Sequence, residues 1–346
     1  MRRLRWPALL LALLSLSCAP SVPRAAKRSA ARPAGRDAAV TPTPAGHIVH
    51  PPARNRAAMA YDAARDKVVL FGGLDATGIF LDDTWTWDNG WVQRRSAESP
   101  SYRYDAAMAY DEARQVVVLF GGCCDGLDNN GLSDTWIWDG AQWTEAHPPA
   151  SPPARSQAAM AYDPRSRLVL LFGGEVLPGN DSSDDLWGWD GATWRRLTPE
   201  SGPSPRVYAG LVRNVHGDGL LLFGGYRAPA PPNDTWFWDG AGTVWKQLSP
   251  AASPPARYNP VLAEDAARGE VVLFGGEYLG RPLADTWIWN GVDWNQRLLV
   301  RGPPPRQDAS IAYAAAQRQV LLFGGFGATR RLDDTWLWDG ASWTEW

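Results

Sequence analysis

The sequence predicts an all-β protein built from six copies of one four-stranded unit. Its 346 residues include 20 Trp, 34 Gly and 29 Pro, and beyond the first twenty residues no long stretch carries apolar residues at helical spacing. This pattern is typical of short strands joined by turns. The triplet Phe-Gly-Gly also recurs six times at intervals of 49 to 52 residues, and such a period indicates internal repeats. We therefore expect very little helix.

Residues 1–18 predict an export signal. They combine a basic start, an apolar run too short to span a membrane in the mature protein, and small residues before Cys18, which is the pattern of a signal peptide. The end of this segment resembles a bacterial lipobox, in which Cys18 becomes lipidated, although Ser15 and Leu16 depart from the usual motif. Ordinary cleavage nearby is the alternative. Either outcome places the mature protein outside the cytoplasm, as a secreted protein or a cell-envelope lipoprotein whose lipid anchor is its only membrane contact.

Residues 19–45 are rich in Ala, Pro and Arg and contain almost no large apolar side chain. They cannot bury enough surface to offset the entropy of ordering, so they predict a disordered linker. Residues 1–45 carry eight Lys or Arg against one acid, Asp37, and the formal net charge of the whole chain is −3, which leaves −10 for the remainder. Because an acidic body repels a phosphate backbone, we expect no nucleic-acid partner.

The order of residues within each repeat is constant. An Arg lies eighteen residues before the first Gly of Phe-Gly-Gly, and a variable loop, a Trp-x-Trp segment and a further Trp follow the Gly-Gly. In the first repeat, residues 57–62 are small at their start, as an innermost strand near a crowded axis requires. Residues 68–71 form a continuous apolar run expected to be buried on both faces. Residues 84–87 alternate with period two, and a tight turn leads to an outer strand that begins at Trp91.

This order resembles the kelch repeat, the unit of many β-propellers and of the central domain of galactose oxidase. The resemblance covers residues 54–346 and rests on the apolar run ending in Gly-Gly and on the spaced aromatics, although the second Trp of each Trp-x-Trp segment stands where Tyr is usual. It implies that residues 46–346 form a six-bladed kelch-type β-propeller with four antiparallel strands per blade. The blades would span about 54–98, 103–147, 155–199, 206–250, 257–300 and 306–346. Blade six supplies its own four strands, and we expect residues 47–54 to lie alongside it.

Eighteen of the 20 Trp fall at three fixed places in the repeats. A ligand site needs a few aromatics in one place, whereas a ring of blades needs a large side chain at every contact between blades, so we interpret these Trp as core. The repeated Arg is likewise expected to bond backbone carbonyls or the Asp before each Trp-x-Trp segment. The arginines are Arg54, Arg103, Arg155, Arg206, Arg257 and Arg306, and the aspartates are Asp83, Asp134, Asp185, Asp234, Asp285 and Asp334.

The two residues after each repeated Arg vary from blade to blade, on the face where the chain enters the first strand and leaves the second. Variation on a constant frame indicates a binding surface, although unselected drift in loops gives the same pattern. The candidate binding residues on this rim are Arg56, Tyr104, Asp105, Gln157, Tyr208, Tyr258, Asn259, Gln307 and Asp308.

The loop at residues 121–134 of the second repeat is unusual. Asp125, Asp128, Asn129 and Asn130 resemble an acidic calcium loop, since a hard cation requires several oxygen ligands on a short segment, and the alternative is a solvated turn. The adjacent Cys123 and Cys124 would form a vicinal disulfide outside the cytoplasm or remain a dithiol. Calcium is the one cofactor that the sequence suggests.

Signatures of catalysis are absent from the sequence. The copper site of galactose oxidase requires two His and a Tyr crosslinked to Cys, whereas the four His here are scattered at His47, His50, His147 and His216. We therefore predict a monomeric, non-catalytic module that binds an unknown protein or glycan. The alternative is a cofactor-free carbohydrate-active enzyme, similar to sialic acid mutarotases, that uses Arg, Tyr and Asp of the rim. A concave site favours the enzyme and a flat or plugged surface favours the binding module.

Overall fold

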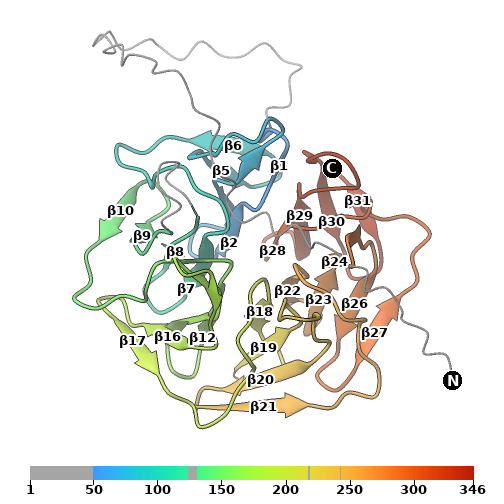
Figure 1. The fold of residues 1–346 in the computed structure, drawn as a ribbon. Helices are drawn as coiled ribbons and strands as arrows, with labels where there is room; N and C mark the ends of the chain where they lie inside the picture. The colour runs from blue at the N-terminus through green and yellow to red at the C-terminus, as the bar shows by residue number, and fades with distance from the viewer. Residues whose placement is uncertain (1–49, 124–130, 217–218, 242) are drawn as a thin grey trace, which may run out of the picture. The chain divides into compact units, whose positions relative to one another are not determined.

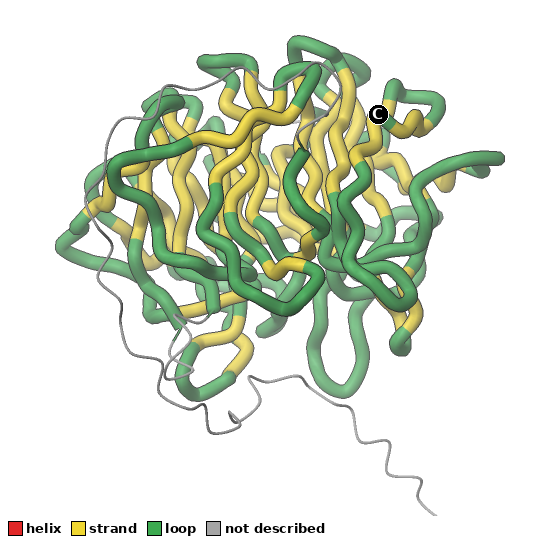
Figure 2. Tube along the Cα trace, turned by 90° about the horizontal axis from the view of Figure 1, so that it is seen from above, coloured by secondary structure: helices red, strands yellow, loops and turns green. Residues whose placement is uncertain are grey.

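The computed structural model describes residues 50–123, 131–216, 219–241 and 243–346. These residues form strands, turns and loops and contain no helix. Among them there is accordingly no helix that could span a membrane. They contain six four-stranded antiparallel sheets arranged as blades around a ring, a six-bladed β-propeller (Figure 1). Figure 2 shows the strands lying side by side with loops at both ends. The prediction of an all-β fold with four strands per blade is confirmed.

Each blade uses its four strands in chain order. They are β2 (Ala58–Asp62), β3 (Lys67–Phe71), β5 (Thr84–Trp87) and β6 (Trp91–Arg94) in blade one; β7 (Ala107–Asp111), β8 (Val116–Phe120), β9 (Thr135–Trp138) and β10 (Trp143–Ala146) in blade two; β12 (Ala159–Asp163), β13 (Leu168–Phe172), β16 (Leu186–Trp189) and β17 (Trp194–Leu197) in blade three; β18 (Gly210–Arg213), β19 (Leu220–Phe223), β20 (Thr235–Asp239) and β21 (Val244–Leu248) in blade four; β22 (Val261–Asp265), β23 (Glu270–Phe274), β26 (Thr286–Trp289) and β27 (Trp294–Arg297) in blade five; and β28 (Ser310–Ala314), β29 (Gln319–Phe323), β30 (Thr335–Trp338) and β31 (Trp343–Glu345) in blade six.

The first strand of each blade is innermost, and first strands of neighbouring blades contact one another around the ring, with β28 meeting β2 (Figure 1). The second strand is almost completely buried, as the continuous apolar run predicts: Val68, Val69, Leu70 and Phe71 expose at most 1% of their surface. Short edge strands lie where the chain enters the first strand and leaves the second. They are β1 (Arg54–Asn55) with β4 (Leu74–Asp75); β11 (Arg155–Ser156) with β14 (Glu175–Val176) and β15 (Asp181–Ser182); and β24 (Glu277–Tyr278) with β25 (Arg281–Pro282).

Tryptophan packing joins the blades, as predicted. In all six contacts between blades, the Phe that ends the second strand meets the outer Trp of the next blade, with ring centroids 5.0 to 5.5 Å apart. The ring closes in the same way, through Phe323 of blade six and Trp91 of blade one. Such aromatic pairs stabilise beyond the area they bury, so the repeated Trp provides the same contact at every junction.

A second contact between blades is a hydrogen bond from the outer Trp to a threonine of the preceding blade. For example, Trp194 Nε1 donates to Thr135 Oγ1 at 2.9 Å. One junction lacks it: Leu186 stands at the threonine position of blade three, and Trp245 Nε1 is a buried donor without a hydrogen-bond partner. A buried donor without a partner keeps its desolvation penalty, so this junction is the least satisfied of the six.

The repeated Arg binds the repeated Asp, which confirms the structural interpretation of both. Arg54 Nη1 and Nη2 donate to the two carboxylate oxygens of Asp83 at 2.6 and 2.8 Å, and Nη1 also donates to Gly72 O at 2.9 Å. Trp85 Nε1 donates to the same carboxylate at 2.6 Å. The same bidentate pair is present in all six blades.

The backbone of the repeated Arg ties its blade to the preceding one. Arg54 N donates to Leu332 O at 3.0 Å, and Gly325 N donates to Arg54 O at 2.8 Å. This part of the predicted segment 47–54 therefore does lie against blade six. Because blade six is complete, the ring closes by packing and by these hydrogen bonds, without a borrowed strand.

Candidate functional site at the centre of the ring

Six residues, one per blade, form what we call the mouth ring. Each lies two positions after the repeated Arg and has a left-handed backbone with φ between 55° and 61°. Five backbone hydrogen bonds of 2.9 to 3.2 Å join neighbouring members, each N–H donating to the carbonyl of the equivalent residue in the preceding blade. One of them, from Arg56 N to Asp308 O, crosses the junction between blade six and blade one. The mouth ring consists of Arg56, Asp105, Gln157, Tyr208, Asn259 and Asp308.

All six members of the mouth ring line one central cavity of about 190 Å³. The residue after each member is small or is proline, and these residues line the cavity as well: Ala57, Ala106, Ala158, Ala209, Pro260 and Ala309. The sequence predicted small residues at the start of the inner strand because the axis is crowded. These small residues leave room around the axis for the larger polar side chains of the mouth ring, which directly precede them. The cavity brings together residues that lie up to 252 positions apart in the chain.

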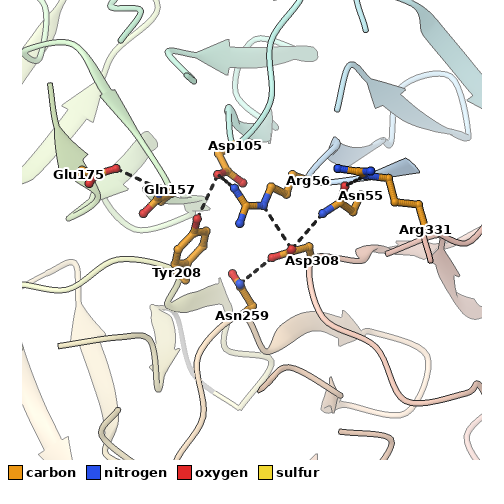
Figure 3. A network of polar contacts seen from close by, with 9 residues as sticks. All are labelled: Asn55, Arg56, Asp105, Gln157, Glu175, Tyr208, Asn259, Asp308 and Arg331. Atoms are coloured by element: carbon orange, nitrogen blue, oxygen red, sulfur yellow. Dashed lines mark hydrogen bonds and ion pairs between the residues drawn. The ribbon is translucent and has the colours of Figure 1, made fainter. Parts of the chain in front are cut away.

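Arg56 lies between the two carboxylates of the mouth ring (Figure 3). Its Nε donates to Asp308 Oδ2 at 3.2 Å and its Nη1 donates to Asp105 Oδ2 at 3.3 Å. Asn259 Nδ2 donates to Asp308 Oδ1 at 2.6 Å, and the Tyr208 hydroxyl donates to Asp105 Oδ2 at 3.3 Å. The side chains of both aspartates are more than 90% buried. The cavity thus has a linked set of charged donors and acceptors with fixed positions.

A second layer of residues surrounds the mouth ring. The residue directly after each repeated Arg pairs with the residue directly after Gly-Gly, as in Ser156 with Glu175 and Tyr258 with Glu277. The Tyr258 hydroxyl donates to the Glu277 carboxylate, and Gln157 Nε2 of the mouth ring donates to Glu175 Oε2 at 3.1 Å. Neither glutamate was among the rim residues predicted from the sequence. The position after Gly-Gly in each repeat would have identified them, because the loop that starts there shares the rim with the start of the first strand.

The remaining predicted rim residues lie in this second layer. Tyr104, Tyr258 and Gln307 pair with Cys123, Glu277 and Phe326 respectively, and they do not line the cavity. The guanidinium carbon of Arg56 lies 5.6 Å from the centre of the Tyr104 ring and 5.7 Å from that of Tyr208. Arg56 is therefore held by two aromatic faces as well as by two carboxylates.

Three members of the mouth ring, Asp105, Tyr208 and Arg56, have raised pKa values. Burial raises the pKa of Asp105 to about 7, and the nearby Asp308 carboxylate adds to this shift while Arg56 opposes it. Burial also raises the pKa of Tyr208, which the Asp105 charge reinforces. Burial lowers the pKa of Arg56, but Asp105 and Asp308 outweigh it, so that its pKa lies well above the ordinary value. Asp105 can therefore exchange a proton near neutral pH, whereas Arg56 stays charged.

The other predicted sites lie mainly outside the described residues. Cys18, Cys124 and the four calcium candidates Asp125, Asp128, Asn129 and Asn130 belong to segments that the structure does not describe. Cys123 is described: it is buried, pairs with Tyr104 at the rim, and is disulfide-bonded. The vicinal disulfide with Cys124 and the calcium site stay predictions. Within the described part of the chain, no group of three or more His, Cys, Asp or Glu could hold a metal ion.

These features define the class of protein. The chain is a β-propeller whose central opening carries six polar side chains on a hydrogen-bonded backbone ring. No protein-family model matches the chain.

Proposed function

We propose that the protein is an exported, monomeric kelch-type propeller that acts as a non-catalytic binding module at the cell envelope and binds a glycan at the mouth ring. The export signal and the repeat order of the sequence support its location and its type. The geometry of the mouth ring supports binding there.

One observation carries this proposal. All six members of the mouth ring have the left-handed backbone, yet none is glycine. A residue with a side chain adopts this conformation at a cost of roughly 1–2 kcal/mol, and glycine adopts it freely. Asn and Asp tolerate it, but Tyr208 and Arg56 are bulky residues for which it is unfavourable. Backbone strain of this kind is typical of functional sites, because the fold alone would be served better by glycine.

The chemistry of the cavity supports a glycan as the ligand. Amide, carboxylate, hydroxyl and guanidinium groups offer donors and acceptors in fixed positions, as the hydroxyl groups of a sugar require. Arg56 with Asp105 and Asp308 sums to one negative charge when both acids are ionised, which disfavours acidic sugars and favours neutral or amine-bearing ones. The cavity volume of about 190 Å³ is below the roughly 300–1,000 Å³ of sites that enclose a small molecule. We therefore expect the cavity to hold part of the ligand while the rim contacts the rest.

A glycan array with the full chain tests this function. We expect Gln157→Ala to lower the glycan signal strongly, because Gln157 lines the cavity and its amide is held by Glu175. Gln317→Ala is the matched control, since Gln317 also donates its amide to a carboxylate, Asp88, but on the exposed turn after β28. Binding to no glycan on the array, together with capture of an envelope protein that Gln157→Ala abolishes, would replace the glycan with a protein ligand. Equal binding by both variants would overturn the site.

A specific observation also favours the enzymatic alternative. Asp105, Tyr208 and Asp308 do converge on one concave site, and the pKa of Asp105 near 7 suits a general acid or base. If the protein is such an enzyme, it should accelerate the interconversion of the anomers of a neutral sugar, followed by NMR. Asp105→Asn should abolish that acceleration, and no acceleration across a panel of sugars would exclude this activity.

A further inference from the structure

The rim between blades one and two carries three aromatic rings in a row. The ring of Phe80 stacks on Tyr104 at 5.4 Å between centroids with 17° between planes, and on Tyr102 at 6.2 Å with 9° between planes. Arg56 of the mouth ring covers the Tyr104 ring. The row therefore leads from the central cavity outward to Tyr102, which exposes 38% of its surface.

The fold does not require this row. Tyr102 occupies the position directly before a repeated Arg, and the other five repeats have Ala or Pro there: Ala53, Ala154, Pro205, Ala256 and Pro305. Because the six blades share one backbone plan, the five other repeats show what the plan needs at this position. A tyrosine that appears once and exposes over a third of its surface is an addition to the plan.

Local hydrogen bonds fix the two outer rings in place. Asp75 Oδ1 accepts from Thr77 N at 2.8 Å, Thr77 Oγ1 at 2.7 Å and Ile79 N at 2.9 Å, which holds the turn before Phe80. The backbone N–H of Arg103, next to Tyr102, donates to Leu81 O at 3.1 Å, next to Phe80. The rings are thus ordered before any ligand arrives, which lowers the entropic cost of binding.

We propose that Tyr102, supported by the stacked ring of Phe80, forms an aromatic subsite that takes the apolar face of a second sugar ring of the same glycan. The inference rests on the proposed function, and it makes the ligand an oligosaccharide. The C–H groups on one face of a sugar ring pack on an aromatic face, and the hydroxyl groups at the ring edge stay available for water and for polar groups of the rim. The continuity of Arg56, Tyr104, Phe80 and Tyr102 connects this subsite to the cavity.

The test compares saccharides of different length. An array of mono-, di-, tri- and tetrasaccharides is probed with the wild-type full chain and with Phe80→Ala, Tyr102→Ala, Tyr102→Phe and Tyr278→Ala. Tyr278 is the control because it exposes 41% of its surface, and none of the described ring contacts includes it. Thermal unfolding of each variant verifies that it is folded.

We expect Phe80→Ala and Tyr102→Ala to weaken the binding of di- and longer saccharides by roughly three- to tenfold, the size of one aromatic contact, and to leave monosaccharide binding unchanged. Tyr102→Phe should retain the ring contact and bind as the wild type, and so should Tyr278→Ala. Unchanged binding of every saccharide by both alanine variants, or an equal loss for mono- and oligosaccharides, would overturn the subsite. If Gln157→Ala still abolishes glycan binding in that case, only the subsite fails; if Gln157→Ala has no effect, the proposed function fails as well.

Discussion

The Gly-Gly pairs and the mouth ring both have a left-handed backbone, but the pairs carry no side chain whereas every member of the mouth ring carries a polar one. Every Gly of the six pairs has positive φ, and at Gly72 a Cβ atom would lie 2.6 Å from Arg103 O, so only glycine fits. The mouth ring faces a cavity and carries a side chain in every blade. Steric exclusion explains the first set. The second set combines a left-handed backbone, which glycine adopts more easily, with side chains that line the cavity, and this combination supports the proposed binding site.

The difference is sharpest between residues two positions apart in the chain. Arg155 exposes 1% of its surface and binds the Asp185 carboxylate with both terminal nitrogens. Gln157 lines the cavity and makes one amide contact, with Glu175. We expect substitutions of buried frame residues such as Arg155 to lower stability, and substitutions of cavity residues such as Gln157 to lower binding.

The largest effect is expected from breaking one buried Arg–Asp pair. Arg155→Met keeps most of the volume but removes the donors of Arg155 to Asp185 and to Gly173 O. The Asp185 carboxylate then keeps Ser183 and Trp187 as donors but loses its positive partner. Removing one partner of a buried ion pair typically costs about 3–5 kcal/mol of unfolding free energy. Chemical denaturation measures this loss, and a loss below about 1 kcal/mol would show that the pair does not hold the blade.

The next effect concerns the hydrogen bond between blades. Thr135→Val preserves the shape of the side chain but removes the acceptor for Trp194 Nε1. The junction between blades two and three would then lack this hydrogen bond, as the junction between blades three and four does at Trp245. A buried donor left without a partner costs about 1–3 kcal/mol, and we expect a loss in that range by denaturation. An unchanged unfolding free energy would mean that Trp packing alone joins the blades.

The third effect is a pH dependence that originates in the mouth ring. The pKa of Asp105 is raised to about 7 in the folded protein from an ordinary value of 3.8. The unfolded chain therefore releases this proton first as pH rises, and the contribution of Asp105 to stability, fully present below its ordinary pKa, is lost as pH rises through 7. Asp105→Asn cannot titrate, so its melting temperature should fall less than that of the wild type between pH 4 and pH 8. Parallel curves for the two proteins would exclude a raised pKa of Asp105.

The frame of the propeller could be predicted because the chain repeats it six times. Every repeat has an Arg and an Asp equivalent to Arg54 and Asp83. A pair of residues present in all blades is expected to make a structural contact that every blade contains, as the bond between Arg54 and Asp83 does. The rim could be predicted in part, since variable residues at a fixed place in a repeat must project to the same side. The sequence also contains the reason why Trp245 lacks an acceptor, because Leu186 stands where the other five repeats have Thr.

The contacts within the mouth ring could not be predicted from the sequence. The ring geometry brings Arg56 to Asp308 across 252 positions, and neither residue type nor spacing indicates which members of six variable pairs meet at the axis. The left-handed backbone of Tyr208 was equally hidden, because propensity assigns tyrosine to a strand. Closure of the ring decides both features, so they become visible only in three dimensions.

Gln157→Gly tests the central claim most directly, with unfolding free energy and glycan binding measured on the same protein. Glycine relieves the left-handed strain at φ 61° while the contact with Glu175 is lost, and because these terms oppose each other we expect stability to stay within about 1 kcal/mol of the wild type. Binding on the glycan array should be lost. Intact binding together with a stability loss as large as that of Arg155→Met would contradict the account, because the mouth ring would then serve the fold rather than a ligand.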